Sequence, residues 1–441
     1  MISAFKDLFA IIDSLVSGGF GWIFFLALVC LLVWMWWKLT VLRNQNKFMA
    51  KIKWIFLEVS IEELSERSPK AMEQVFTALH AMRPSLTWGE VLSGKMNLHI
   101  SCEIVSLGGK VSYIFRVAER YRDLLESAIF AQYPKAEIKE VEDYMRNMPH
   151  EFYPDKVDFD FWGTQLNKRN ANAYPIRVFT EFEHPEQKTF VDPVANIIEV
   201  MSNIEPYELM AYQLVIRAIG NDWKDHVQHL LDELKGVPKK NSAGLFDIIM
   251  EIPRVFMDII VRDLMGINPE AEQKAPTKIK EEPPTLMLHK SDVEKQVIAA
   301  IEHGLSKLTF EVKIRLLYLA PKDRFNRRRR SPELVGAFRG FDDINMNGLK
   351  PDTGHTWTDL HYYVSKKLEA PIMRQRKLTR MRHMWHYFIG RKIWQGSGET
   401  YLNTEELASI FHFPVAPNVR VSQLERVGAV KAAPPPDLPV G

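Results

Sequence analysis

The chain has 441 residues, of which 46% are hydrophobic, and its formal net charge is +2. This length and apolar content allow two or three domains with hydrophobic cores. The two cysteines, Cys30 and Cys102, exclude a disulfide-stapled fold and stand in no metal-ligand spacing, which suits a reducing compartment.

One apolar stretch near the N-terminus predicts a transmembrane helix over residues 18–38. No charged residue lies between Asp13 and Lys38, and a hydrocarbon core of about 30 Å needs roughly 20 apolar helical residues. A buried core helix is the alternative, and a cleaved signal peptide fits poorly because the run is long and no small-residue cleavage site follows. The membrane-anchor residues are Gly21, Trp22, Phe24, Leu28, Leu32, Trp34, Trp36 and Trp37, and indole rings favour the headgroup layer.

The segments beside this stretch predict its orientation. Residues 1–17 form an amphipathic lead-in with Lys6, whereas residues 39–53 form a basic juxtamembrane segment. By the positive-inside rule, we expect a single-pass protein of an inner or plasma membrane, with its N-terminus outside and the bulk of the chain in the cytoplasm. The basic segment either attracts anionic lipid or serves only as the topology signal.

Residues 54–150 predict a ferredoxin-like domain. Expected strands at residues 55–59, 98–107, 111–117 and 136–144 alternate with helices at residues 68–82 and 120–133. The resulting β-α-β-β-α-β order is that of the split β-α-β unit. Gly108 and Gly109 form the hairpin turn and not a phosphate loop, because they lie between two strands.

The middle of the chain predicts further units of the same kind. Residues 151–265 form a second α/β module, with strands at 174–181 and 208–219 and helices at 193–204 and 222–234. Residues 289–320 form the core of a third module, with a helix at 291–301 and a strand at 308–319. Self-similarity between these pairs indicates duplication, and convergent strand patterns remain the alternative.

The second module ends in an amphipathic helix at residues 245–265. Its five charges exclude a second membrane span, so it contacts the membrane, a partner or its own sheet. Residues 266–288, rich in Pro, Glu and Lys, form a flexible linker. We therefore expect an α+β fold, in which the transmembrane helix precedes tandem ferredoxin-like modules and a basic, mainly helical C-terminal section.

That basic section covers residues 321–400. Between Lys322 and Lys392 there are 17 Lys and Arg residues against 7 Asp and Glu residues. Guanidinium groups neutralise phosphates and the interleaved aromatic rings can stack on bases, although such charge runs also form solvated faces or contacts with acidic lipids and proteins. The candidate contacts with nucleic acid or an acidic partner are Arg327, Arg328, Arg329, Arg330, Arg374, Arg376, Lys377 and Arg380.

The sequence predicts no catalytic centre. We find no convincing Ser/His/Asp set, no cofactor motif and no complete set of metal ligands, so we expect a non-enzymatic protein without a cofactor. Residues 401–441 predict a short helix with an Asn or Thr cap and early glutamates, followed by a Pro-rich extended tail.

Three parts of the chain resemble a known family. They are residues 402–408 with 411–414 and the closing 434–439, residues 68–76, and residues 133–138. They resemble the N-terminal, non-ATPase region of bacterial membrane-anchored conjugation or type IV secretion ATPases of the HerA/FtsK-like class. In that class the first of these stretches lies just before the nucleotide-binding domain.

This chain departs from the family because the P-loop domain is missing from the sequence, so no catalytic residue is carried over. The resemblance implies a membrane-anchored subunit that tethers a DNA- or protein-transfer ATPase, located on a separate polypeptide or on a missing portion of a longer product. The expected partners are membrane lipid, that ATPase and further copies of the chain. The alternative is a membrane-tethered module that binds nucleic acid through the basic section.

Overall fold

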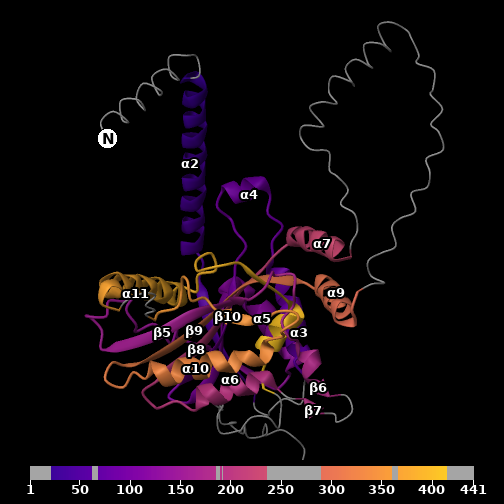
Figure 1. Cartoon of the computed structure of the whole chain (residues 1–441), viewed down its shortest axis with the longest axis vertical. Helices are drawn as coiled ribbons and strands as arrows, with labels where there is room; N and C mark the ends of the chain where they lie inside the picture. The colour runs from indigo at the N-terminus through magenta and orange to yellow at the C-terminus, as the bar shows by residue number, and fades with distance from the viewer. Residues whose placement is uncertain are drawn as a thin grey trace, which may run out of the picture.

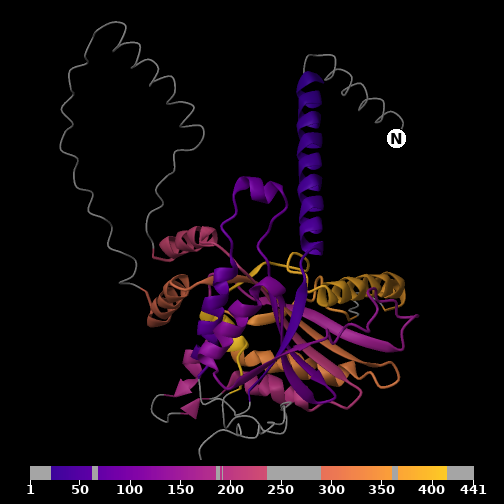
Figure 2. The same cartoon turned by 180° about the vertical axis from the view of Figure 1, so that it is seen from behind.

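A computed structural model describes residues 21–61, 68–184, 189–190, 192–235, 290–359 and 366–414. The predicted lead-in (residues 1–17), the amphipathic helix (245–265), the linker (266–288) and the Pro-rich tail lie outside the described residues. Figures 1 and 2 show one long helix, α2, standing on a sheet that is covered by further helices. The expected mixture of helices and strands behind one apolar helix is confirmed.

The described residues contain one nine-stranded antiparallel sheet. Its strand order is β10-β5-β9-β8-β2-β3-β1-β4, and β11 pairs with β9 off this path. The strands are β1 (Trp54–Ile61), β2 (Ile100–Leu107), β3 (Lys110–Ala118), β4 (Ala136–Val141), β5 (Phe159–Lys168), β8 (Leu209–Ala218), β9 (Thr309–Pro321), β10 (Leu349–Pro351) and β11 (Thr400–Asn403). Two short strands, β6 (Glu183–His184) and β7 (Thr189–Phe190), pair separately.

The helices vary widely in length. They are α2 (Gly21–Ala50), α3 (Lys70–Leu79), α4 (Trp88–Leu92), α5 (Arg122–Gln132), α6 (Pro193–Ser202), α7 (Asp222–Lys235), α9 (Asp292–Leu305), α10 (Arg327–Ala337), α11 (Lys366–Ile389) and α12 (Thr404–Ile410). Single 3₁₀ turns form η2 (His80–Met82), η3 (Glu119–Tyr121), η4 (Phe179–Phe182) and η6 (Phe338–Phe341).

The sheet consists of two halves with the same strand order. Strands β1 to β4 pair as β4-β1-β3-β2, and strands β5, β8, β9 and β10 pair as β10-β5-β9-β8. Strand β2 of the first half pairs with strand β8 of the second half, from Ile100 opposite Ile216 to Leu107 opposite Leu209. We call this pairing the β2–β8 junction. Strands β4 and β10 therefore form the two ends of the strand order.

Local sequence signals explain several element boundaries. Gly108 and Gly109 have φ values of +58° and +91°, the left-handed conformation that a two-residue hairpin turn requires. The Asp192 carboxylate accepts hydrogen bonds from the backbone of Val194 and Ala195, while Pro193 occupies the first turn of α6. These residues fix where β2 ends and where α6 begins.

The two faces of the sheet carry separate hydrophobic cores. On one face, helices α3, α5, α6, α10 and α12 cover a large core that includes Phe76, Phe115, Tyr212 and Phe338. On the opposite face, α11 packs on a smaller core that includes Trp385. Figures 1 and 2 show α2 and α11 on the same side of the sheet, with α11 lying crosswise to α2.

The structure differs from the expected elements at several points, of which three concern the predicted modules. Residues 174–181 form a loop and part of η4 instead of a strand, because the backbone N–H groups of Ile176 and Phe179 donate to the side chains of Glu406 and Ser409. Strand β5 was not predicted. Strand β9, assigned to a third module, lies between β5 and β8, so the second and third predicted modules share one sheet.

Candidate functional site

Helix α2 has the length and composition of a membrane span. Within Phe25–Ala50, an apolar window of 18 residues has a mean hydropathy of 2.1, and none of this window is buried in the protein. Of the predicted anchor residues, Leu28, Leu32, Trp34, Trp36 and Trp37 are all exposed; Gly21, Trp22 and Phe24 lie in the first turn of the helix. An apolar helix that the fold leaves uncovered is suited to lipid.

Helix α2 continues well beyond the apolar stretch and meets a second element there. From Lys38 to Ala50 it forms a stalk that leads directly into β1. The Asn44 amide of this stalk donates to the carbonyl oxygen of Leu92 at the end of α4 over 3.2 Å. Gly94 approaches so closely that an added Cβ would lie 2.4 Å from the carbonyl carbon of Asn44. The α4 loop is therefore packed against the stalk.

The four consecutive arginines of the basic section do not form one free surface. They begin α10, and Arg330 is buried, with its guanidinium 2.6 Å from the Glu208 carboxylate. Burial tends to raise the pKa of Glu208, but hydrogen bonds led by the one from Arg330 outweigh it and hold this pKa below its ordinary value. Arg327 pairs with Asp359, and Arg329 pairs with Glu333.

Of these four arginines, Arg328 is exposed and has no ion pair within the described residues. The four residues from Arg327 to Arg330, called the tetrad below, therefore differ in role. Arg330 is buried and structural, whereas its neighbours lie nearer the surface. Sequence reasoning missed this division because the partner of Arg330 lies on a distant segment, just before β8.

The remaining candidate cations lie on α11, whose two halves differ. The C-terminal half is held by the smaller core, where the rings of Phe161 and Trp385 lie 5.0 Å apart. An open groove of about 560 Å³ lies along the middle of this helix and is lined by Pro371, Ile372, Gln375, Arg376, Thr379 and Arg380. Arg374 is exposed and Lys377 is half-buried.

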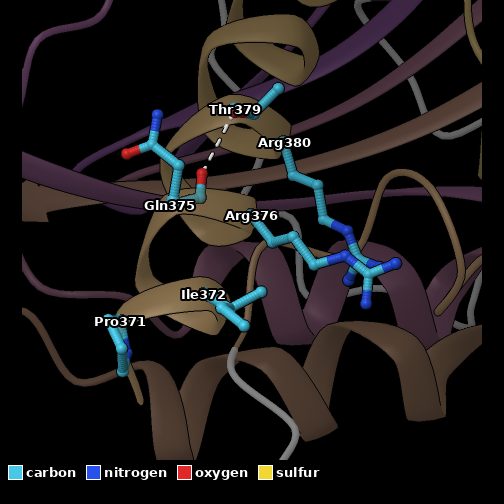
Figure 3. A pocket seen from close by; sticks show the side chains of 6 residues that line it. All are labelled: Pro371, Ile372, Gln375, Arg376, Thr379 and Arg380. Atoms are coloured by element: carbon cyan, nitrogen blue, oxygen red, sulfur yellow. Dashed lines mark hydrogen bonds between the residues drawn. The ribbon is translucent and has the colours of Figure 1, made fainter. Parts of the chain in front are cut away.

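The guanidinium groups of Arg376 and Arg380 extend in the same direction from successive turns of α11 (Figure 3). Arg380 donates to the carbonyl oxygens of Thr353, Gly354 and Trp357, so its position is fixed by the loop after β10. No ion pair to Arg374, Arg376 or Lys377 is found among the described residues. The groove thus places the exposed side chain of Ile372 beside guanidinium groups that have no carboxylate partner among the described residues.

A buried charge network fixes the C-terminal end of α11. Arg391, with φ +48°, bonds to the Glu103 carboxylate at 3.0 Å and to the Asp143 carboxylate at 2.6 Å. Arg315 of β9 donates to the backbone carbonyl oxygen of Tyr387 over 3.0 Å. Because Arg391 and Glu103 are almost fully buried, the pair places α11 firmly against the β2–β8 junction.

Helix α12 lies at the same junction on the opposite face, and every one of its residues is buried. Phe411, the next residue, contacts the rings of Phe76 and Phe115 at 6.3 and 5.6 Å in one half of the sheet. It also lies 6.3 Å from the ring of Tyr212 in the other half. The segment therefore packs against both halves at once.

The polar residues of α12 are also buried, and they form hydrogen bonds and ion pairs inside the protein. The Asn403 side chain accepts from the backbone of Glu405 and Glu406, which confirms the expected cap. Glu406 lies 2.7 Å from the Lys168 ammonium, and Glu405 lies 2.8 Å from the Lys307 ammonium. The sequence predicted these glutamates only as residues of a helix start; their lysine partners gave no local signal.

No group of three or more His, Cys, Asp or Glu side chains suited to a metal occurs in the part of the chain that the structure describes.

The profile of a family described as a domain of unknown function, DUF8128, matches residues 63–420. The chain belongs to the DUF8128 family. The match begins after α2 and β1, covers the other strands of both halves of the sheet and includes α12, so the features described above, α2 and β1 excepted, lie within the DUF8128 region. A search of curated proteins finds no match.

Proposed function

We propose that this DUF8128 protein is a non-enzymatic, membrane-anchored subunit that tethers and organises a DNA- or protein-transfer ATPase of a conjugation or type IV secretion-like system. In this proposal α2 crosses an inner or plasma membrane with its N-terminus outside. The sheet then lies in the cytoplasm, and the chain beyond Pro414 leads to the motor.

The observation that carries this proposal is the burial of α12 at the β2–β8 junction. Residues 402–408 and 411–414 resemble the stretch that precedes the nucleotide-binding domain in the HerA/FtsK-like class. Here they are held by Lys168, Lys307 and rings from both halves of the sheet. A chain that leaves from such a site is held rigidly relative to α2, which is what a tether for a motor requires.

We also propose that each half of the sheet is a ferredoxin-like unit. Support comes from the two strand orders, which both read 4-1-3-2 when each half is numbered separately. Helices α3 and α5 stand in the two crossover positions of the first half, and α6 and α10 stand in those of the second. Residues 219–308, with α7 and α9, replace the hairpin of the second half.

The exposed cations of α11 favour nucleic-acid binding as a second candidate function. Arg374 and Arg376 have no carboxylate partner among the described residues, and Ile372 beside them is 65% exposed. Phosphates would neutralise these guanidinium groups, and the groove would accept a sugar or base edge.

The first proposal is tested by purifying the detergent-solubilised chain after expression with its chromosomal neighbours. We expect a P-loop ATPase to co-purify, identified by mass spectrometry and by ATP hydrolysis. Replacing Pro434, Pro435 and Pro436 with Ala should reduce its recovery, whereas Pro371→Ala, at an exposed proline of α11, should not. Recovery of no P-loop ATPase with the unaltered chain would remove the proposal.

The second candidate is tested by measuring duplex DNA binding over a range of salt concentrations. Replacing Arg374, Arg376 and Lys377 with Ala should weaken binding and lower the slope of log K against log salt by about 0.9 for each lost phosphate contact. Arg146→Ala, which removes an exposed, ion-paired arginine, is the matched control. A slope that the triple replacement leaves unchanged contradicts this function.

A further inference from the structure

The loop that carries α4 stands apart from the rest of the domain. Residues 83–99 leave the sheet after η2, rise along the stalk of α2 and return to β2. Figures 1 and 2 show α4 beside α2 and well above the sheet, toward the N-terminal end of the stalk. This loop is therefore closer to the apolar part of α2 than the body of the sheet is.

The depth of α4 follows from helix geometry. Asn44, which contacts Leu92, lies six residues beyond Lys38, the first charge after the apolar stretch. At about 1.5 Å per residue this places the contact about 9 Å below the end of the span. Each headgroup layer is about 5 to 8 Å thick. Since Leu92 is the last residue of α4, α4 lies at the outer boundary of the headgroup layer when α2 spans the bilayer.

The chemistry of the α4 loop suits that depth. Leu92, the last residue of α4, is 40% exposed, so the loop presents an apolar side chain beside the stalk. The Glu90 carboxylate is paired with the Lys95 ammonium at 2.7 Å, so the loop presents no uncompensated negative charge there. Arg43 and Lys47 are exposed on the adjacent stalk and add positive charge, which attracts anionic headgroups.

We propose that the α4 loop, residues 83–99, is a second membrane contact that lies in the headgroup layer of an anionic bilayer beside α2. This inference rests on the proposed membrane anchoring by α2. A single helix leaves a domain free to tilt relative to the bilayer, whereas a second contact off the helix axis fixes which side of the sheet faces the bilayer. The face that carries α11 is then held toward the membrane.

Two glycines offer matched sites for a test. Gly89 on α4 and Gly336 on α10 are both exposed, and an added Cβ at either position meets no atom within 4 Å. Helix α10 lies on the face of the sheet away from α2 (Figure 1). Gly89→Cys and Gly336→Cys are made in the full chain with Cys30→Ser, and Cys102 stays unlabelled because it is buried. The unaltered chain, labelled at Cys30, reports on the span.

Each protein is labelled with an environment-sensitive nitrobenzoxadiazole and reconstituted into vesicles of phosphatidylcholine and phosphatidylglycerol. A nitroxide on the lipid headgroup or acyl chain serves as the quencher. We expect acyl-chain quenching at Cys30, headgroup quenching at Gly89→Cys and neither at Gly336→Cys. Adding Leu92→Asp should reduce the quenching at Gly89→Cys, because a charge replaces the exposed apolar side chain.

The outcomes separate this inference from the membrane anchoring on which it rests. Quenching at Cys30 with none at Gly89→Cys overturns the second contact and leaves the anchor standing; the α4 loop then faces solvent or a protein. Loss of quenching at Cys30 overturns both. Unchanged far-UV circular dichroism shows that the variants are folded.

Discussion

Replacing Glu406 with Gln tests whether the burial of α12 stabilises the whole domain. The Glu406 side chain is 4% exposed and that of Lys168 is 2% exposed, with 2.7 Å between the carboxylate and the ammonium. The substitution keeps the size of the side chain and an acceptor for the backbone N–H of Ile176. It leaves the Lys168 ammonium with the carbonyl oxygen of Asn172, 3.1 Å away, and no carboxylate.

A buried ammonium without a carboxylate partner lowers the free energy of unfolding. Removing one partner of a buried ion pair destabilises a protein by about 3 to 5 kcal/mol, and we expect Glu406→Gln to fall in this range. The matched control is Glu142→Gln, which removes the 77% exposed partner of Arg146 and should cost about 0.5 kcal/mol or less. The large difference follows mainly from solvent access, and Glu406→Gln also leaves one oxygen in place of the two that accept from the backbone N–H groups of Ile176 and Asn403.

The measurement is equilibrium urea unfolding of the detergent-solubilised chain, followed by circular dichroism and by protease sensitivity. Joint replacement, Glu406→Leu with Lys168→Met, removes both charges and should recover part of the loss. If Glu406→Gln lowers the free energy of unfolding no more than Glu142→Gln does, the ion pair does not hold α12 in the core.

Three further substitutions probe other parts of the structure. Arg330→Met should lower the free energy of unfolding by about 3 to 5 kcal/mol, because Glu208 is left buried without its partner, as urea unfolding will show. Gly94→Ala should separate the α4 loop from the stalk and speed hydrogen exchange there, because its φ of +88° is strained for Ala and its Cβ would overlap Asn44. His99 has a pKa held well below 6.5, mainly by burial, so its neutral form stabilises the fold above about pH 6.5 and this stability is lost as the pH falls. His99→Phe should therefore flatten the decrease of stability on acidification.

Each of these has a control in the same chain. Arg328→Met, at the exposed position of the tetrad, should change stability little, and an equal loss would mean that Arg330 has no special role. Gly89→Ala adds a methyl group to the same loop in open space, so it should leave exchange in the loop unchanged. His383→Phe, at an exposed histidine of α11, should keep the pH dependence of the unaltered chain; flattening there as well would contradict the assignment to His99.

Elements with strong local signals could be predicted from the sequence. The hairpin around Gly108, the start of α6 and the cap at Asn403 depend on neighbouring residues only, and each was found where expected. Strand β5 was missed because it is buried on both faces around Gly163, so it shows no simple alternation. Its pairing with β9 joins segments about 150 residues apart, which no local pattern reveals.

The candidate site was harder to predict because charge alone does not distinguish exposed from buried residues. Arg328 and Arg330 look equivalent in the sequence, yet Glu208 withdraws Arg330 from the surface. In the same way, Glu406 reads as a residue of a helix start and is a partner of Lys168. These roles depend on contacts between distant segments, which only the folded chain brings together.

In the proposed membrane arrangement, the two ends of the sheet limit how copies of this protein could meet. Anchored proteins are confined to two dimensions, so open strand edges would pair with those of neighbours. Strand β4 carries Glu137, Lys139 and Glu140, and β10 has three residues and ends at Pro351. Charges and proline disfavour edge pairing. Copies of the chain that assemble side by side would therefore meet through surfaces other than the β4 and β10 edges.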